Sequence, residues 1–268
     1  GKESNRQIDK KIINQAKERL KTIYYDFNPL LAQEHLRDDN NINLSKETVR
    51  QLMIGENLWH PRKKINIKKH YWRERKDNYG EMQQFDGSYH NWFEDRNEKE
   101  LGLEQCLLLS VDDATGKITG AKFEDNEGVR AVFRFWKEYL IDIGVPISIY
   151  LDKFSTYKIN HKSAVDNAEM MSQFKRAMEE LGIKVINANS PEAKGRIERL
   201  FGTLQDRLVK ELRLAEIHDR DTANKFLKET YLPEHNKRFT VTPRSSGNAH
   251  RPLTDELRGK LPAVFSVQ

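Results

Sequence analysis

Apolar residues recur at helical spacing through residues 1–60, and this pattern predicts an all-helical first region. The first predicted helix carries its apolar side chains at Ile8, Ile12, Ala16, Leu20 and Ile23. Asn28 and Pro29 end this helix and start a second one, because asparagine caps helix starts and proline fits the first helical position. Ser45 is expected to cap a third helix over SKETVRQLMIGENL in the same way.

A helix, a short polar link and a serine-capped helix are typical of a helix-turn-helix unit. Under this interpretation residues 1–60 bind DNA through the outer side of the third helix. The outward residues near the start of that helix are Lys46, Glu47, Thr48, Arg50 and Gln51. The alternative is a small helical bundle that makes no DNA contact. The basic segment that follows directly, residues 61–77, favours the DNA-binding interpretation.

Residues 78–215 alternate between strand and helix patterns. The predicted elements are a strand at MQQFDGSYHNWF, a hairpin from CLLLSVDD to ITGAKFE, a helix over NEGVRAVFRFWKEYLIDIG, a strand at PISIYLD, a helix over AEMMSQFKRAMEELG, a strand at IKVINAN and a long helix from Pro191 to Leu214. Gly116 supplies the glycine of the hairpin turn. This order predicts an α/β fold: an RNase H-like mixed five-stranded sheet with helices on both faces.

Residues 216–268 are expected to form one helix around DTANKFLKETYL and then a basic tail. The segment EHNKRFTVTPRSSGNAHRPL contains proline and glycine, which favour irregular, extended chain on a surface. The predicted organisation is therefore a helical region (1–60), a basic linker (61–77), an RNase H-like catalytic core (78–215) and a C-terminal helix with an extended tail (216–268).

The 268 residues carry a formal net charge of +5, which favours a polyanionic partner. The positive charge is concentrated in HPRKKINIKKHYWRERK, where eight residues are Lys or Arg and one is Glu. Such a run is commonly a solvated surface, but Trp59, Tyr71 and Trp72 favour a nucleic-acid contact because aromatic rings stack on bases. The candidate phosphate-binding residues in this segment are Lys63, Lys64, Lys68, Lys69 and Arg73.

Cys106, the only cysteine, lies in an apolar run and is expected to be a small buried side chain. No apolar stretch approaches 18 residues and no signal peptide opens the chain, so we expect a cytoplasmic protein. The chain begins with Gly1 rather than Met, which indicates a fragment or a processed protein with a segment missing upstream.

Three acids lie where the predicted fold would place chemistry, at the ends of adjacent strands and on the helix that packs against them. Asp86 shares a strand face with Gln84 and Ser88, and Asp152 ends the fourth strand. Glu198 lies at the border between solvent and the buried stripe of the long helix. That stripe consists of Ile197, Leu200, Phe201, Leu204 and Leu208. Taken singly, the three acids could be a turn residue, a loop cap and an ordinary surface glutamate.

Phosphodiester displacement requires that the attacking and leaving oxygens are stabilised together, and two hard divalent cations about 3.5–4 Å apart do this. Hard cations prefer carboxylate oxygens, and three acids can hold two Mg²⁺ ions if one carboxylate bridges both. The hypothesis is a site with two Mg²⁺ ions, for which Mn²⁺ can substitute, held by Asp86, Asp152 and Glu198. Asp112 and Asp113 are rival acids, which we interpret as the end of the second strand and its turn.

The segments QFDGSYHNWF, IYLDKFSTYK and NSPEAKGRIERLFGTLQDRLVKEL resemble the three catalytic blocks of DDE transposases with an integrase-type core, in particular the ISNCY-type insertion-sequence group. The resemblance covers residues 44–253 and implies that Asp86, Asp152 and Glu198 are the DDE triad. The interval from Asp152 to Glu198 is 46 positions, longer than is common in retroviral integrases, and fits an insertion around STYKINHKSAVDNAEM. The zinc module of two His and two Cys found in retroviral integrases is absent, because Cys106 is the only cysteine.

The resemblance implies a bacterial, nucleoid-associated transposase that hydrolyses a phosphodiester at the transposon end and transfers the released 3′-OH to target DNA. Its partners would be transposon-end and target DNA, and it would act as a homo-oligomer because two ends must be joined. Phosphate-binding candidates near the triad are Lys153, Lys194, Arg196 and Arg199. Two alternatives share the sequence features: an RNase H-like nuclease without strand transfer, and a catalytically silent, DNA-binding domesticated transposase.

Overall fold

The computed structural model describes residues 8–61, 73–96, 104–152, 167–188 and 195–267. The chain divides into two units, Gly1–Lys69 and His70–Gln268, and each has its own buried core. The division falls inside the segment that the sequence predicts to be a basic linker. None of the helices in the described ranges combines the length and the apolar character that crossing a membrane requires.

The described part of the first unit is helical. It contains α1 (Lys10–Thr22), α2 (Pro29–Asp38) and α3 (Lys46–Gly55). The caps predicted from the sequence are confirmed. The side chain of Asn28 accepts hydrogen bonds from the backbone amides of Leu30 (3.0 Å) and Leu31 (2.9 Å), and Ser45 accepts one from Thr48 (3.1 Å).

The apolar stripe predicted for the first helix is only partly buried. Ala16 and Leu20 are fully buried against α2 and α3, whereas Ile8 and Ile12 are exposed. Ile8 also precedes α1, so the prediction that it belongs to the first helix was wrong, whereas Ile12 lies within α1. Helix α1 has 13 residues while its two packing partners have 10 each, so the bundle has less surface to cover the start of α1.

A mixed five-stranded sheet in the order β3-β2-β1-β4-β5 forms the centre of the second unit. The strands are β1 (Met82–His90), β2 (Gln105–Asp112), β3 (Ile118–Glu124), β4 (Ser148–Asp152) and β5 (Lys184–Ala188). The first three strands pair antiparallel, and β4 pairs parallel with both β1 and β5. The RNase H-like order predicted from the sequence is confirmed.

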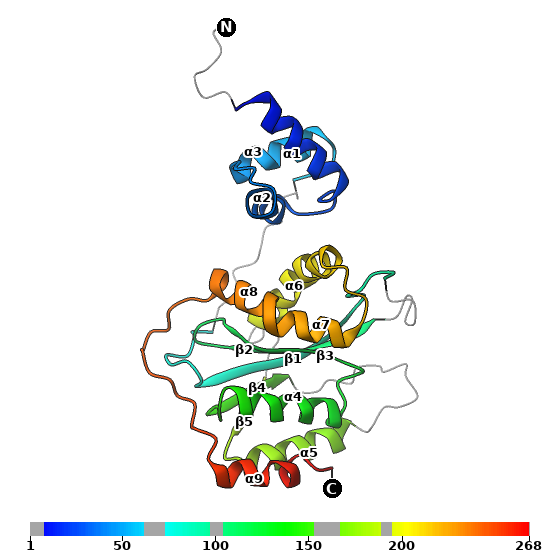
Figure 1. Ribbon diagram of the computed structural model, residues 1–268. Coiled ribbons are helices and arrows are strands. Elements are labelled where there is room, and N and C mark those ends of the chain that lie inside the picture. Colours follow the sequence, from blue (N-terminus) through cyan, green and yellow to red (C-terminus); the bar gives the residue numbers. More distant parts are fainter. Residues whose placement is uncertain (1–7, 62–72, 97–103, 153–166, 189–194, 268) are drawn as a thin grey trace. The chain divides into compact units, whose positions relative to one another are not determined.

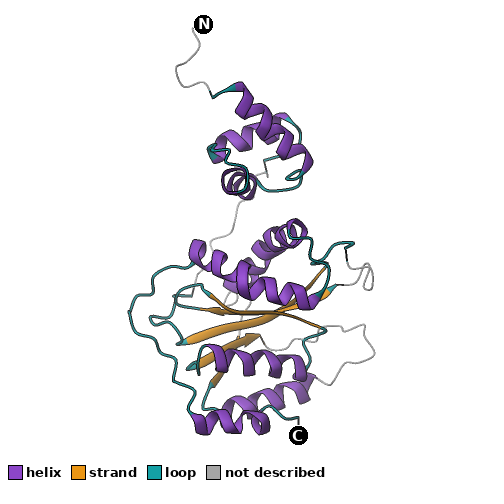
Figure 2. Ribbon diagram, in the orientation of Figure 1, coloured by secondary structure: helices purple, strands orange, loops and turns teal. Residues whose placement is uncertain are grey.

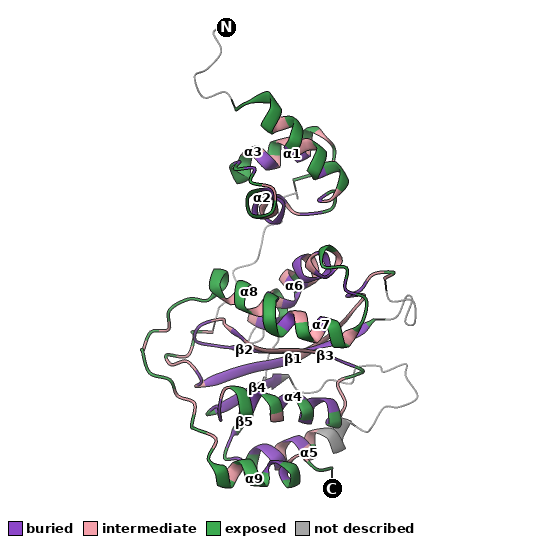
Figure 3. Cartoon of the chain, in the orientation of Figure 1, coloured by how far each residue is buried: buried purple, intermediate pink, exposed green. Residues whose placement is uncertain are grey.

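Helices cover both faces of this sheet, as Figure 1 shows, so the fold has three layers (Figure 2). One layer contains α4 (Val129–Asp142), α5 (Asn167–Glu180) and α9 (Asp255–Val264). The other contains α6 (Gly195–Leu214), α7 (Arg220–Phe226), the π-helical turn η2 (Leu227–Tyr231) and α8 (Leu232–Phe239). The sheet and the inner sides of the helices are buried, and the outer sides of the helices are exposed (Figure 3).

The C-terminal segment departs from the sequence prediction at both of its ends. The prediction of irregular chain was wrong for residues 234–239, which complete α8, and it gave no element for residues 255–264, which form α9 with Thr254 as cap. Residues 240–253 are extended, as predicted, and run between the two helical layers along the edge of the fold (Figure 1). Backbone hydrogen bonds from Val241 to Thr115 (2.9 Å) and between Arg251 and Val145 (2.9 Å) hold this segment in place.

Two asparagines from the C-terminal helices bind the outer edge of β3. The Asn236 side chain accepts from the amide of Ile118 (2.8 Å) and donates to its carbonyl (2.9 Å). The Asn224 side chain makes the same pair with Phe123, at 2.7 and 3.0 Å. Each amide thus replaces the two hydrogen bonds that a neighbouring strand would give at that position.

We expect Asn236→Ala to lower the free energy of unfolding by about 1–3 kcal/mol, because it leaves the backbone amide and carbonyl of Ile118 without these partners. Urea denaturation followed by circular dichroism measures the change. Lys237→Ala, at the next and exposed position of α8, is the control and should leave the midpoint unchanged. Equal midpoints for the two variants would contradict a structural role for Asn236.

A pH dependence of stability is expected from His235 of α8. Burial, and then the positive charge of Arg207, lower the pKa of His235 from 6.5 to about 4. The unfolded chain therefore takes up this proton at a higher pH than the folded chain. The corresponding stability is complete above pH 6.5 and is lost as the pH falls through 4, by about 3 kcal/mol in total. His235→Phe keeps a ring against Tyr231 and should lose less stability between pH 7 and pH 4 in urea titrations.

Candidate active site

The alternation of side chains along β1 places Asp86 on the sheet face that α6 covers. In the antiparallel pairing Asp86 lies opposite Leu109, which belongs to the core beneath α6. Phe85 belongs to the core on the opposite face, beneath α4. This is the division of β1 into two faces that the sequence predicts.

One link through Asp113 and one direct hydrogen bond connect α6 to β1. At the start of the helix, Arg196 donates to Asp113 Oδ1 (2.7 Å), and Gln84 Nε2 donates to the same oxygen (2.6 Å). Further along, Gln205 Nε2 donates to Ser88 Oγ (3.2 Å). Arg196 and Gln205 are about 13 Å apart along an α-helix, and Gln84 and Ser88 are about 13 Å apart along a strand. The matching spacing means that α6 runs alongside β1 in the same direction.

Asp86 and Glu198 both lie between these two contacts. Asp86 is half-buried and stands midway between Gln84 and Ser88 on their face of β1. Glu198 is exposed in the first turn of α6 and precedes Gln205 by two helical turns, so the two side chains leave the helix on the same side. The strand and the helix therefore bring Asp86 and Glu198 to one surface.

Asp152 is the last residue of β4, next to β1. The parallel register pairs Gln84 with Tyr150, and Asp86 and Asp152 each stand two residues beyond that pair in the same direction. On the other edge of β4, Asp152 pairs with Ala188 of β5. The structure describes the backbone of Asp152 but not its side chain. The pairing of β1 with β4 ends at Gln84 and Tyr150, so Asp86 and Asp152 follow the last pair by the same number of residues on adjacent strands.

Asp112 is not available to a metal ion, because both of its oxygens accept hydrogen bonds inside the protein. Oδ1 accepts from the Gly80 amide (2.9 Å) and Gln83 Nε2 (3.0 Å), and Oδ2 accepts from the amide (2.9 Å) and hydroxyl (2.7 Å) of Thr115. The side chain is buried. The interpretation of Asp112 as the end of a strand that shapes the following turn is confirmed.

Asp113 is also buried and has a larger set of donors. Its Oδ1 accepts from Arg73, Gln84 and Arg196, and its Oδ2 accepts from the backbone amide of Lys76 (2.8 Å). This carboxylate joins three segments of the chain: the residues before β1, β1 itself and the start of α6. The sequence predicts Asp113 to be a turn residue, and no local pattern reveals donors that are remote along the chain.

The basic residues proposed to bind phosphate differ in their surroundings. Arg73 and Arg196 both donate to Asp113, and Arg196 also donates to the carbonyl of Arg73 (2.6 Å). Arg199 is exposed and its Nε donates to the carbonyl of Gly195 (2.5 Å). Burial, and then the nearby charge of Arg75, lower the pKa of Arg199. Arg199 therefore stands at a surface that is already positive.

The candidates in the first unit lie at the start of α3. Lys46 is exposed, and the hydroxyl of Thr48 lies 2.9 Å from that of Ser45. Arg50 is held by Glu47 at 2.6 Å, and this arginine lowers the pKa of Glu47 to about 2. Several predictions fall outside the described residues: the helix start at Pro191, and the phosphate-binding candidates Lys63, Lys64, Lys68, Lys69, Lys153 and Lys194.

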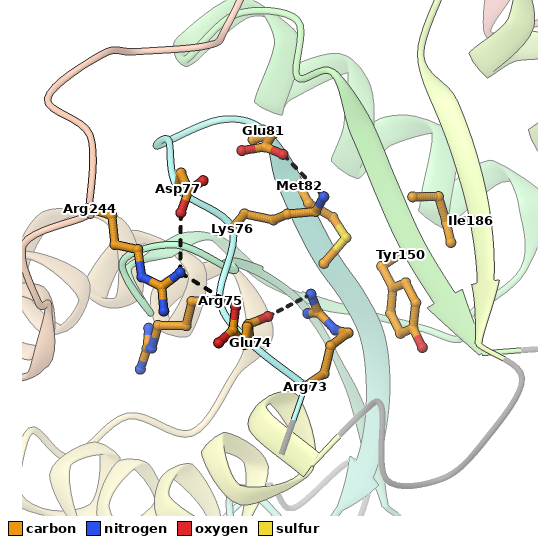
Figure 4. A pocket seen from close by; sticks show the side chains of 10 residues that line it. All are labelled: Arg73, Glu74, Arg75, Lys76, Asp77, Glu81, Met82, Tyr150, Ile186 and Arg244. Carbon is orange, nitrogen blue, oxygen red and sulfur yellow. Dashed lines mark hydrogen bonds and ion pairs between the residues drawn. The ribbon is translucent and has the colours of Figure 1, made fainter. Parts of the chain in front are cut away.

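A hollow of about 440 Å³ adjoins this surface on the side of β4 and β5. Its floor is apolar and comes from Met82, Tyr150 and Ile186 on three adjacent strands, as Figure 4 shows. Its rim consists of basic and acidic residues. The basic ones are Arg73, Arg75, Lys76 and Arg244, and the acidic ones are Glu74, Asp77 and Glu81. Because Tyr150 pairs with Gln84, the floor continues the face of the sheet that carries Asp86.

The strand order and the helical cover define the second unit as a member of the RNase H-like class of α/β folds. No protein-family model matches the sequence. The chain is 40% identical to "Putative transposase y4bF" of Sinorhizobium fredii, over 97% of this chain and 56% of that protein. It is 31% identical to "Transposase for insertion sequence IS1202" of Streptococcus pneumoniae, over 88% of this chain and 57% of that protein. The chain is therefore a homologue of insertion-sequence transposases, and it spans little more than half the length of these two relatives.

Two solved structures that are similar to the chain come from retroviruses. One is a simian T-cell lymphotropic virus intasome in complex with PP2A regulatory subunit B56 gamma, with a TM-score of 0.47 and 14% identity over 92% of this chain and 73% of that chain. Another is the HTLV-2 integrase catalytic core domain in complex with magnesium, trimeric form, with a TM-score of 0.40 and 17% identity over 55% of this chain and 82% of that chain.

Proposed function

We propose that the chain is the catalytic part of a DDE transposase, which hydrolyses a phosphodiester at each transposon end and transfers the released 3′-OH to target DNA. The observation that carries this proposal is the alignment of α6 with β1, which brings Asp86 and Glu198 to one surface beside the strand position of Asp152. The 40% identity to a protein named as a transposase supports the same reaction class.

Asp86, Asp152 and Glu198 are the residues that would hold divalent metal ions. Among the described side chains, which include Asp86 and Glu198 but not Asp152, no cluster of three metal-binding groups occurs. The donor set fits hard cations, because all three residues supply carboxylate oxygens. We propose two Mg²⁺ ions, replaceable by Mn²⁺, which when bound would activate the attacking oxygen and stabilise the leaving oxygen.

The chain's own residues position the nucleic acid. In this proposal β1, β4 and α6 carry the three carboxylates, while Arg199 supplies positive charge for phosphate. Contacts of this kind position DNA without reading its sequence. We propose that reading of the transposon end falls to the first unit, through Lys46, Thr48 and Arg50 of α3. Because two ends must be joined, the active form would be a homo-oligomer.

Asp86→Asn and Glu198→Gln are each expected to lower Mg²⁺-dependent strand cleavage on the order of a thousandfold, since a lost metal ligand removes several kcal/mol of transition-state stabilisation. The assay follows nicking of a labelled transposon-end duplex, and a pre-cut end tests strand joining separately. Glu179→Gln, an exposed glutamate of α5, is the matched control and should cleave normally. Full activity in Asp86→Asn would overturn the assignment, and cleavage without joining would indicate a nuclease.

Lys46→Ala is expected to weaken binding of transposon-end DNA and to reduce the slope of log affinity against log salt by about 1, because one phosphate contact is lost. Fluorescence anisotropy over a series of salt concentrations measures both quantities. Lys10→Ala removes the same charge from α1 and should leave the slope unchanged. Equal slopes for the two variants would show that α3 is not the DNA-contacting helix.

A further inference from the structure

We propose that Asp113 and Arg196 form a positioning pair for Glu198, and that Arg196 acts inside the protein rather than on DNA phosphate. The inference rests on the function proposed above, because it takes Glu198 as a metal ligand. It concerns a carboxylate and a guanidinium that touch neither substrate nor metal ion but fix the element that carries one of the ligands.

Asp113 has the surroundings of a structural anchor. It is 1% exposed, and its four described donors are Arg73, Gln84, Arg196 and the backbone amide of Lys76. A buried carboxylate is stable only when hydrogen-bond donors and opposite charges surround it. Any change in one of these donors therefore affects the position of the others through the shared carboxylate.

A single oxygen of Asp113 connects the two elements that carry the proposed ligands. Gln84, two residues before Asp86 on the same face of β1, donates to Oδ1 at 2.6 Å. Arg196, two residues before Glu198 in the first turn of α6, donates to the same oxygen at 2.7 Å. This shared oxygen therefore fixes the distance between β1 and the start of α6, at a point near both Asp86 and Glu198.

Arg196 has its contacts inside the protein. One terminal nitrogen donates to Asp113 and the other donates to the backbone carbonyl of Arg73 at 2.6 Å. The side chain is 19% exposed, and burial lowers its pKa. A guanidinium that grips phosphate uses paired N–H groups in a fork, and these two nitrogens already bind protein acceptors. The first turn of a helix lacks intrahelical partners for its amides, so an anchor at this turn limits its movement.

The test measures metal binding directly, on the full chain without DNA, by titrating Mn²⁺ and following its electron paramagnetic resonance signal. Arg196→Lys and Asp113→Asn are expected to weaken Mn²⁺ affinity about tenfold, the effect typical of residues that orient metal ligands. Arg196→Lys keeps the charge but cannot make both contacts. If Asp113→Asn fails to fold, the Arg196→Lys variant alone is sufficient to test the proposal.

The matched control is the ion pair between Glu124 and Arg134, which joins β3 to α4 away from Asp86 and Glu198. Glu124 is also buried and also binds a guanidinium, in this case through both of its oxygens, whereas the guanidinium groups bound to Asp113 share Oδ1. Glu124→Gln and Arg134→Lys should therefore reduce thermal stability by an amount similar to the test variants, while leaving Mn²⁺ affinity unchanged. Equal loss of Mn²⁺ affinity in the controls would overturn the proposal, because it would reflect general destabilisation.

Two further measurements separate the possible results. The salt slope of DNA binding should be unchanged in Arg196→Gln, which removes the charge, and a fall of about 1 in that slope would show that Arg196 contacts phosphate. An unchanged Mn²⁺ affinity in Arg196→Lys would overturn the positioning role. The Asp86→Asn variant is titrated with Mn²⁺ in the same way. If it abolishes Mn²⁺ binding and Arg196→Lys does not weaken it, the positioning pair is wrong while the proposed metal site stands. If Asp86→Asn binds Mn²⁺ normally, the proposed site itself is wrong, and the positioning pair with it.

Discussion

The alternation of side chains along β1 is the constraint on which the rest of the site depends. β1 is the central strand, paired with β2 on one edge and β4 on the other. A shift of one residue would move Phe85 out of the core beneath α4 and turn Asp86 into it, at the cost of burying a charge. The hydrophobic effect on one face of the sheet thus selects which face presents the carboxylate. The parallel pairing with β4 then places Asp152 two residues beyond the last pair, as Asp86 is on β1.

Much of the architecture could be predicted because it depends on residues that are close together in the sequence. The alternation in β1, the helical spacing in α4 and the capping residues Asn28 and Ser45 each follow from residues close together in the chain. Tertiary context decided the places where the prediction was wrong. Ile8 has helical spacing but lies before α1, and residues 234–239 join a helix that a basic, polar sequence does not suggest. Whether Asp86, Asp152 and Glu198 act together stays a prediction, since sequence and backbone alone place them.

Basic residues show most clearly what a sequence cannot reveal. A positive chain suggests a DNA-binding surface, yet several arginines bind backbone carbonyls of the protein itself. Arg251 donates to the carbonyls of Leu181 (2.8 Å) and Gly182 (2.9 Å), and Arg176 donates to those of Val264 (3.0 Å) and Ser266 (2.7 Å). These arginines fasten the C-terminal segment and α9 to the layer of α4 and α5. Net charge therefore overstates the number of cations that face a polyanion. Only the contacts in the structure distinguish the basic residues that bind the protein itself from those that are left for a polyanion.

The asparagine contacts on β3 have a consequence for association between copies of this chain. A peptide that extended the sheet at β3 would need the amide and carbonyl of Ile118 and Phe123, and Asn236 and Asn224 already occupy them. Strand addition at this edge would first require α7 and α8 to detach. Subunits that meet on this side are thus directed to use helical surfaces, and the sheet is protected there from uncontrolled fibre-like growth.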